Sequence, residues 1–239
     1  MNMVKILGIP FHALTVDQTL EKFESFLATK QNHIIVTPNP EGVMQARRNP
    51  ALSHALQSAT LSLADGIGII IAARLKRLKL PGRVRGFDIV MALFERLDAK
   101  QGGTVYLLGA APGVAERAAE NIEKRYPAIK VIGHHHGFFD DDEPIIAEIS
   151  RLSPDIVIAG MGMPRQELWA IKNSSISTRI TLCVGGTIDV LAGEVKLAPA
   201  FMRKMGLEWL YRLVNQPSRA KRMLDLPRFM LAVIFSKGI

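Results

Sequence analysis

Short apolar runs that stop at glycine recur along this sequence, and segments with helical spacing of apolar residues follow them. The pattern is clearest over residues 155–193, where DIVIAG precedes a helical segment and TLCVGG precedes a polar turn. Such runs are typical of parallel strands that lead into helices. Strands that alternate with helices predict one parallel sheet with helices on both faces. We therefore expect an α/β fold of Rossmann-like type, with a C-terminal helical appendage.

In a parallel sheet of this kind, ligands bind beyond the carboxyl ends of the strands, where loop amides and helix N-termini can receive phosphate. An anionic, nucleotide-like ligand is therefore expected near Gly160, Gly162, Gly185 and Gly186. Pro164 suits the first turn of a helix, which would place Arg165 and Gln166 at a helix start facing that ligand. Glycine after a strand also serves tight turns and close packing, and that alternative stays open.

Two further runs end in polar residues. The predicted strand at 33–37 is broken by Pro38-Asn39-Pro40, and the predicted strand at 61–64 reaches Asp65-Gly66. If the two strands are parallel neighbours, Thr37, Asn39 and Asp65 lie at one edge of the sheet. An aspartate before a helix is also a common N-cap, so the residues alone leave Asp65 equally a cap or a catalytic group.

The other predicted elements follow the same criteria. They are strands at 4–9, 104–108 and 129–133, and helices at 15–29, 41–59, 67–79, 87–99 and up to 126. Arg83 and Arg85 fall in a loop between two of these helices, and loops near strand ends often carry functional residues. The loop GAAPG that begins at Gly109 is a weak phosphate-loop signal. It does not match the dinucleotide fingerprint, which disfavours a nicotinamide-dependent oxidoreductase.

Two clusters contain residue types that bind metal ions, and both have a simpler interpretation. Consecutive side chains in HHH at 134–136 cannot all point the same way, so they are poor joint ligands. DDD at 140–142 contains the Asp-x-Asp of metal-dependent sugar transferases, but it immediately precedes Glu143-Pro144 and a helical pattern. An N-cap aspartate, an acidic first turn and an early proline are expected there for local reasons. We expect no metal.

Positive charge is concentrated near the C-terminal end. Residues 203–239 hold eight basic and two acidic residues, which accounts for six of the eight net positive charges of the sequence. Apolar residues alternate with the basic ones, which favours a helix in an anionic membrane interface; packing onto the protein's own core is the alternative. No nucleic-acid-binding motif accompanies the charge. We divide the chain into an α/β core at 1–196 and a basic amphipathic appendage at 197–239.

The single cysteine, Cys183, lies inside an apolar run. One cysteine cannot form an internal disulfide, and this favours a reducing compartment. The start of the sequence lacks the pattern of a signal peptide, and no apolar run reaches the roughly 18 residues of a membrane span. We expect a cytoplasmic protein that is peripheral on the inner face of the cell membrane.

Five motifs together point to a family. They are TPNPEGV from Thr37, ADG from Ala64, GMGMPRQE from Gly160, VGGTIDVLAGEVKLAP from Val184 and GLEWLYRLVNQPSRAKR from Gly206. This combination, over about residues 6–222, closely resembles the WecG/TagA/CpsF glycosyltransferases. The resemblance implies transfer of a sugar, commonly N-acetylmannosamine or its uronic acid, from a UDP donor to N-acetylglucosamine carried on undecaprenyl diphosphate. It also implies inversion, with no obligatory metal and no cofactor.

Roles for particular residues come with the resemblance. It makes Asp65 the general base, with Thr37 and Asn39 beside it as part of the catalytic group. It places Arg83 near the acceptor or donor phosphates. The predicted substrate-binding positions, from the resemblance and from the strand-end glycines, are Arg83, Gly109, Gln166, Gly185, Gly186, Asp189, Arg212, Arg219 and Arg222. Phe138 stands where the family often has tyrosine after the glycine at 137, so a hydroxyl contact there stays open.

The expected chemistry agrees with these roles. Attack of a sugar hydroxyl on an anomeric carbon needs a base and charge stabilisation of the departing diphosphate. A carboxylate can supply the first, and arginine presents a planar fork suited to phosphate oxygens. The rival hypothesis is a non-catalytic, nucleotide-responsive module that docks on membrane or RNA through its basic end. A homo-oligomer is left open.

Overall fold

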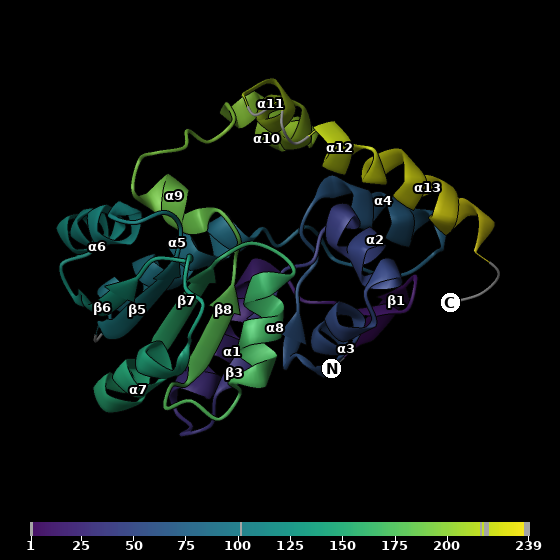
Figure 1. The fold of residues 1–239 in the computed structure, drawn as a ribbon. Coiled ribbons are helices and arrows are strands. Elements are labelled where there is room, and N and C mark those ends of the chain that lie inside the picture. The colour runs from purple at the N-terminus through teal and green to yellow at the C-terminus, as the bar shows by residue number, and fades with distance from the viewer. Residues whose placement is uncertain (1, 101, 216, 218–219, 237–239) are drawn as a thin grey trace.

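The computed structural model describes residues 2–100, 102–215, 217 and 220–236 (Figure 1). Among them, six strands form one parallel sheet in the order β4-β3-β8-β7-β5-β6. The strands are β3 (His33–Val36), β4 (Leu61–Ser62), β5 (Gly103–Gly109), β6 (Ile129–His135), β7 (Ile156–Gly160) and β8 (Ile180–Cys183). The predicted α/β fold is confirmed.

Strand side chains alternate between two hydrophobic clusters on opposite faces of the sheet. In β5, Val105 and Leu107 belong to one cluster, and Tyr106 and Leu108 belong to the other. The first cluster includes buried residues of α1 (Val16–Leu27), α5 (Gly86–Asp98), α6 (Val114–Arg125) and α9 (Thr187–Leu191). The second includes residues of α2 (Pro40–Arg48), α3 (Pro50–Ser58), α4 (Ile67–Leu75), α7 (Glu143–Leu152) and α8 (Arg165–Lys172). Helices therefore cover both faces, as predicted.

The N-terminal segment differs from the prediction of one strand at 4–9. It is an antiparallel hairpin of β1 (Met3–Ile6) and β2 (Ile9–His12). Leu7 and Gly8 form the turn with φ values of 50° and 85°, and a two-residue hairpin turn with both φ values positive matches the right-handed twist of the strands. The hairpin lies at the β4 edge of the sheet, where the backbone N–H of Ser62 donates to His12 Nδ1 at 3.0 Å.

The predicted single helix at 41–59 is also wrong. It is two helices, α2 and α3, separated at Asn49. Pro50 cannot donate a backbone hydrogen bond and therefore begins a new helix. The side chain of Asn49 accepts a hydrogen bond from the N–H of Leu52 at 3.1 Å and caps that second helix.

The C-terminal helices α10 (Ala200–Met205), α11 (Glu208–Asn215), α12 (Ala220–Met223) and α13 (Asp225–Phe235) form an arm across one end of the molecule (Figure 1). We call them the C-terminal arm. Its last helix packs on α2 and α4. Phe229 and Val233 are fully buried there, and Asp225 accepts two hydrogen bonds from Arg48, at 2.6 and 3.0 Å. The arm thus contributes to the hydrophobic core, while the domain boundary near residue 196 stays a prediction.

None of the helices in the described part of the chain has both the length and the apolar character needed to cross a membrane.

Candidate functional site

The ends of β3 and β4 bring the three predicted catalytic residues to one edge of the sheet. The two strands pair in parallel, and the backbone N–H of Asp65 donates to Pro38 O at 3.3 Å. The Thr37 hydroxyl is buried and donates to Cys183 O at 3.0 Å. Asn39 Oδ1 accepts from Gly42 N–H at 2.9 Å as the N-cap of α2. This bond fixes the orientation of the Asn39 side-chain amide.

Asp65 is half-buried at this edge. The N-cap position of α4 is occupied by the next residue, Gly66, with φ 83°, and no side chain caps the helix there. This positive φ favours glycine at the position. The interpretation of Asp65 as the N-cap residue of α4 is therefore wrong.

A pair of arginines stands next to Asp65 in the loop before α5. Val84 lies between them, buried, and its N–H donates to Ala64 O at 2.9 Å. Because side chains alternate along an extended segment, Arg83 and Arg85 both project away from the core side that Val84 occupies. Each arginine side chain is 17% exposed, so both are held in defined positions.

The C-terminal arm contacts both arginines. Arg83 donates to Arg203 O at 2.6 Å and lies 3.7 Å from Glu208. Arg85 pairs with Glu208 and donates to Asp88 Oδ2 at 2.5 Å. Burial alone would lower the pKa of the Arg85 guanidinium, but Asp88 and Glu208 outweigh burial and raise it. These contacts place α10 and α11 beside the sheet edge that carries Asp65.

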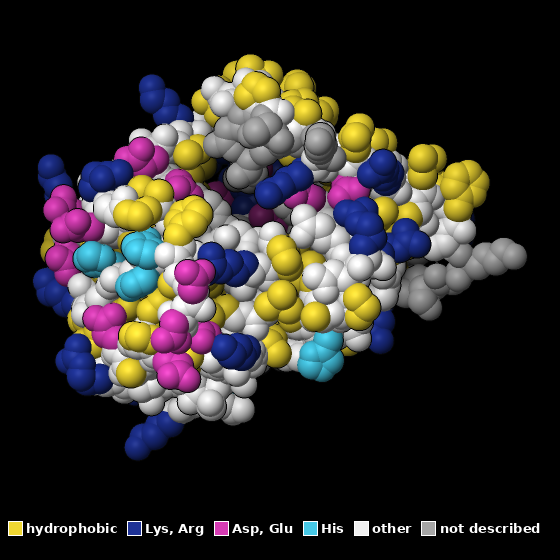
Figure 2. All heavy atoms as spheres, viewed as in Figure 1, with side chains coloured by type: hydrophobic (Ala, Val, Ile, Leu, Met, Phe, Trp, Pro, Cys, Tyr) yellow, Lys and Arg dark blue, Asp and Glu magenta, His cyan; other side chains and the backbone are white. Residues whose placement is uncertain are grey.

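A second contact joins the arm to the residues after Asp65. Gly206 has φ 75°, and a side chain at this position would approach Cβ of Ile67 within 2.8 Å. The turn between α10 and α11 therefore requires glycine both for its backbone conformation and for its close contact with α4. Below α10 and α11, Figure 2 shows a recess in which basic and acidic side chains are visible.

The glycines at the centre of the sheet edge serve close backbone packing. A Cβ at Gly109 would lie 2.5 Å from the backbone of Gly160, and a Cβ at Gly160 would lie 2.8 Å from Gly185 O. The ends of β5, β7 and β8 can therefore meet only without side chains. This observation supports the packing interpretation for Gly109, whose contact with substrate stays a prediction.

Gln166 connects two of the glycine loops. Its Oε1 atom accepts from Gly162 N–H at 3.1 Å and from Gly185 N–H at 3.0 Å, and its Nε2 donates to Glu167 Oε1 at 2.7 Å. These two amides are therefore already engaged, contrary to the expectation that they receive phosphate. Gly186 and Asp189, at the start of α9, follow directly from this loop, and their substrate contacts stay predictions.

Glu167 is the unusual residue of this region. It is fully buried, and its Oε2 atom has no hydrogen-bond partner among the described residues. Burial raises the pKa of Glu167 to about 7, against smaller lowering effects of the hydrogen bonds from Gln166 and the backbone. The neighbouring thiol of Cys183 is buried too, and burial followed by the charge of Glu167 raises its pKa.

Arg165 contacts the segment after β6, which lies against the end of β5 because the Gly137 N–H donates to Ala110 O at 2.8 Å. Its guanidinium donates to Gly137 O and Phe139 O, both at 2.5 Å, and lies 4.5 Å from the Phe139 ring centroid. Arg165 thus holds the segment after β6. Phe138, in the same segment, is 68% exposed.

The three predicted tail arginines have different outcomes. Arg222 lies 3.8 Å from Glu41, in the first turn of α2, which places it near the Asn39 end of the site. Arg219 lies outside the described residues, and for Arg212 the structure describes the backbone of α11 alone. Arg212 lies in α11 and Arg222 in α12, which are separate helices.

The aspartates before α7 match the predicted cap in position, with Glu143 in the first turn and an early proline, but not in bonding. Asp142 occupies the N-cap position but makes no capping hydrogen bond. Instead, its carboxylate accepts from Lys172 at 2.9 Å and from Asn173 at 2.9 Å, and Asp141 accepts from the N–H of Glu143 at 3.0 Å. Across the described residues, no three His, Cys, Asp or Glu side chains converge as a metal site would require.

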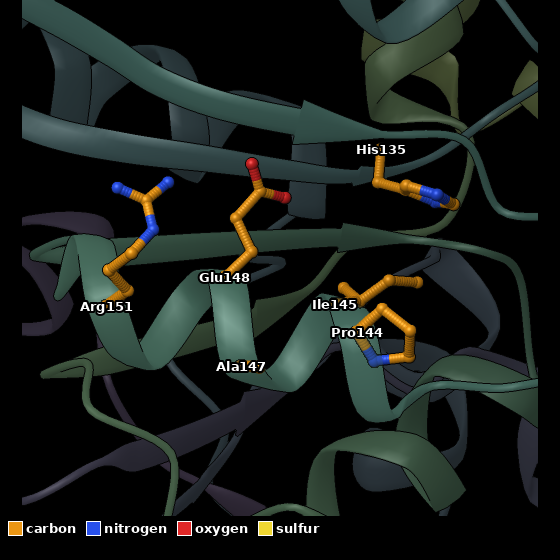
Figure 3. Close-up of a pocket in the computed structure, with 6 residues that line it drawn as sticks. All are labelled: His135, Pro144, Ile145, Ala147, Glu148 and Arg151. Atoms are coloured by element: carbon orange, nitrogen blue, oxygen red, sulfur yellow. The ribbon is translucent and has the colours of Figure 1, made fainter.

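A shallow depression of about 420 Å³ lies between β6 and α7 (Figure 3). It is lined by His135, Pro144, Ile145, Ala147, Glu148 and Arg151. Glu148 accepts a hydrogen bond from the buried Tyr106 hydroxyl at 2.6 Å. β6 and β4 are the outermost strands on opposite sides of the sheet, so this depression is separate from the site around Asp65.

Sequence reasoning missed two acidic residues of this region. Glu208 binds both loop arginines, and Glu167 is buried beside Gln166. A signal for Glu208 was present, because it is one of only two acidic residues in a basic segment. A glutamate in the first turn of a helix is ordinary, so nothing marked Glu167 as buried.

A carboxylate at a strand end, with arginines from a loop and an arm beside it, is the arrangement expected of an enzyme that transfers a group from a phosphorylated donor. A family model described as "Glycosyl transferase WecG/TagA/CpsF family" matches residues 4–238. The chain belongs to this family and is a hexosyltransferase, as the motifs predicted.

Two curated relatives share most of their length with the chain. A protein of Bacillus spizizenii is 34% identical over 225 residues, which cover 92% of this chain and 87% of the relative. A protein of Staphylococcus aureus strain MRSA252 is 33% identical over 238 residues, which cover 98% and 93%. Each is named N-acetylglucosaminyldiphosphoundecaprenol N-acetyl-beta-D-mannosaminyltransferase.

Proposed function

We propose that this protein transfers N-acetylmannosamine, with inversion, from a UDP donor to N-acetylglucosamine carried on a polyprenyl diphosphate. Such a product would serve the synthesis of a cell-surface polymer. The observation that carries the proposal is the family match over residues 4–238, combined with relatives named for this reaction at 33–34% identity. The clustering of Asp65 with Thr37 and two loop arginines supports it.

In the proposed reaction, Asp65 is the general base. The acceptor hydroxyl would lose its proton to this carboxylate as it attacks the anomeric carbon of the donor. Thr37 supports this geometry through its bond to Cys183 O, because it ties the end of β3 to the end of β8. Asn39 would contribute its Nδ2 group from the start of α2.

The departing diphosphate requires positive charge. Arg83 and Arg85 stand in the loop beside Asp65, and Arg222 approaches α2 from the arm. Arginine can replace a metal in this role, because its fork binds two phosphate oxygens at once. The arm would therefore contribute to leaving-group stabilisation, and the reaction would need no divalent cation.

We also propose that the arm rests on the membrane that holds the acceptor. Several of its apolar side chains are exposed, as Figure 2 shows along the outer side of the arm. They are Phe201, Met205, Trp209, Leu210, Val214, Leu224, Leu231, Ile234 and Phe235. The packing alternative accounts for Phe229 and Val233, which face α2 and α4, but it does not account for this second, outward face. Apolar residues beside basic ones suit an anionic interface.

Release of UDP tests the catalytic proposal. The protein is incubated with UDP-N-acetylmannosamine and a prenyl-diphosphate N-acetylglucosamine analogue in detergent, and UDP release is measured over time. We expect release that depends on both substrates. Tight UDP binding without turnover, across a panel of UDP-sugars, would favour the non-catalytic module instead.

Vesicle sedimentation tests the membrane proposal. We expect the protein to sediment with vesicles that contain anionic lipid, and the double variant Phe201→Ser/Val214→Ser to sediment less. Charge on each basic residue near the surface contributes about 1 kcal/mol, so binding should also weaken at high salt. Equal sedimentation of the variant and the unchanged protein would contradict the proposed orientation.

A further inference from the structure

One side-chain amide joins the two glycine loops that follow β7 and β8. Gly162 has φ 80° and Gly185 has φ 55°, and a Cβ would meet nothing within 4 Å at either position. Both positions therefore favour glycine because of their backbone conformation. A side chain there would not clash with neighbouring atoms. Glycine loops of this kind are flexible unless something holds them. Both of their N–H groups donate to the same atom, Oε1 of Gln166.

The orientation of this amide depends on Glu167. Gln166 is 3% exposed, so water cannot compensate for a lost hydrogen bond. Its Nε2 group donates to Glu167 Oε1 at 2.7 Å, which directs Oε1 of the amide toward the two glycines. Burying a carboxyl group costs free energy unless it is compensated. Glu167 is fully buried, and one of its oxygens has no hydrogen-bond partner in the part of the chain that the structure describes. A glutamate whose only role is to stabilise the N-terminus of a helix need not be buried. Glu116, in the first turn of α6, is exposed.

We propose that Gln166 and Glu167 form a clamp that positions the glycine loops after β7 and β8 for the transfer reaction. The clamp acts through the backbone of the two glycine loops, and this role replaces the direct substrate contact predicted for Gln166. This inference rests on the proposed function, because it assigns both residues as positioning residues for that reaction.

The clamp reaches the catalytic edge through β8. Gly185 is followed by Gly186 and by α9 with Asp189. On the other side of Gly185, Cys183 O accepts the hydrogen bond of Thr37, and the Cys183 thiol lies 3.6 Å from Gln166 O. A shift of the β8 end would therefore move both Cys183 O, to which the Thr37 hydroxyl donates, and the start of α9. Misplacement of reacting groups by about 1 Å can lower a rate ~100-fold.

Four variants test the clamp by two measurements. Gln166→Met and Glu167→Met remove the hydrogen bonds and keep approximate size, Glu167→Gln keeps an acceptor for Gln166, and Glu116→Met is the exposed control at the same helix position. The first measurement is hydrogen exchange of the Gly162 and Gly185 amides, with the Leu107 amide of β5 as internal reference. The second is UDP release, analysed as kcat and donor KM.

We expect both methionine variants at 166 and 167 to exchange the two glycine amides about tenfold faster or more, with kcat lowered ~10- to 100-fold. Glu167→Gln and Glu116→Met should stay within about threefold of the unchanged protein in both measurements, because the hydrogen bonds of the clamp are retained. If Gln166→Met does not fold, the three variants at 167 and 116 decide the outcome.

Three results would overturn the clamp. The first is unchanged glycine exchange in a folded Glu167→Met protein. The second is a Glu167→Gln protein as impaired as Glu167→Met. The third is a raised donor KM in Gln166→Met with unchanged exchange, which would identify Gln166 as a direct substrate contact. If no donor supports turnover in any protein, the proposed function fails, and the exchange measurements still decide the clamp.

Discussion

Replacing Glu167 by glutamine should make the protein more stable at alkaline pH and leave its stability nearly unchanged at pH 4.5. The folded protein holds this carboxyl group buried, with a pKa raised to about 7 from its ordinary 4.5. The folded state therefore binds the proton more tightly than the unfolded state. The cost of ionising the buried group is absent while Glu167 is protonated. The stability that depends on this proton is therefore fully present below the unfolded pKa and is lost as the pH rises through the folded pKa.

The magnitude follows from the two pKa values. Each unit of difference between folded and unfolded pKa corresponds to about 1.4 kcal/mol, so ionisation of Glu167 should cost about 3 kcal/mol above pH 7. Glutamine has a similar size and no charge, so Glu167→Gln removes this cost. For a chain of 239 residues, the gain would raise the melting temperature by roughly 6–12 °C at pH 8.

Urea unfolding at pH 4.5, 6, 7 and 8 measures this difference. The free energy of unfolding is compared between Glu167→Gln and the unchanged protein at each pH, so pH effects of all other groups cancel. We expect the difference to grow from pH 4.5 to pH 7 and then level off. The Cys183 thiol remains protonated over this range, because burial and Glu167 raise its pKa. A difference that is constant with pH would refute the assignment of a neutral buried carboxyl group.

Four further predictions concern the site and the arm. Asp65→Asn should retain donor binding and lower turnover by ~10² to 10⁴; UDP release above about half of the original rate would exclude Asp65 as the base. EDTA should leave UDP release largely intact, because the proposed mechanism stabilises the diphosphate with arginines; loss of activity that Mg²⁺ or Mn²⁺ restores would revive a metal-dependent mechanism. Phe229→Ala should lower the free energy of unfolding in urea by about 3–5 kcal/mol, whereas a loss below ~1 kcal/mol would show that α13 is not part of the core. Gly206→Ala should lower kcat with a small loss of stability, because it displaces the arm at Ile67; full activity would show that this contact does not position the arm.

The sequence predicted the sheet and the place of the site better than the contacts within the site. Apolar runs that stop at glycine depend on local chemistry, and they located the strand ends and the juxtaposition of Thr37, Asn39 and Asp65. The split of the helix at Asn49-Pro50 also has a local cause. The sequence analysis nevertheless predicted one helix, because the helical spacing of apolar residues continues across the break.

Contacts between distant segments left no comparable signal. The Arg85–Glu208 pair joins residues 123 positions apart, and Gly185 meets Gln166 across 19 positions. Gln166 could therefore be placed at a helix start, but its use of the two glycine amides could not be anticipated. The same holds for α13, whose sequence is apolar on both faces. The sequence alone could not show which face would be buried.

The packing of α13 also determines when, during synthesis, α2 and α4 can reach their native packing. The hydrogen bonds between Arg48 and Asp225 join residues 177 positions apart, so α2 and α4 leave the ribosome long before the helix that covers them. Until α13 follows, the apolar surface that receives Phe229 is open to water and to other nascent chains. Such late contacts slow folding and expose a chain to aggregation. The helices that begin next to Asn39 and Asp65 thus reach their final packing only after α13 has been made.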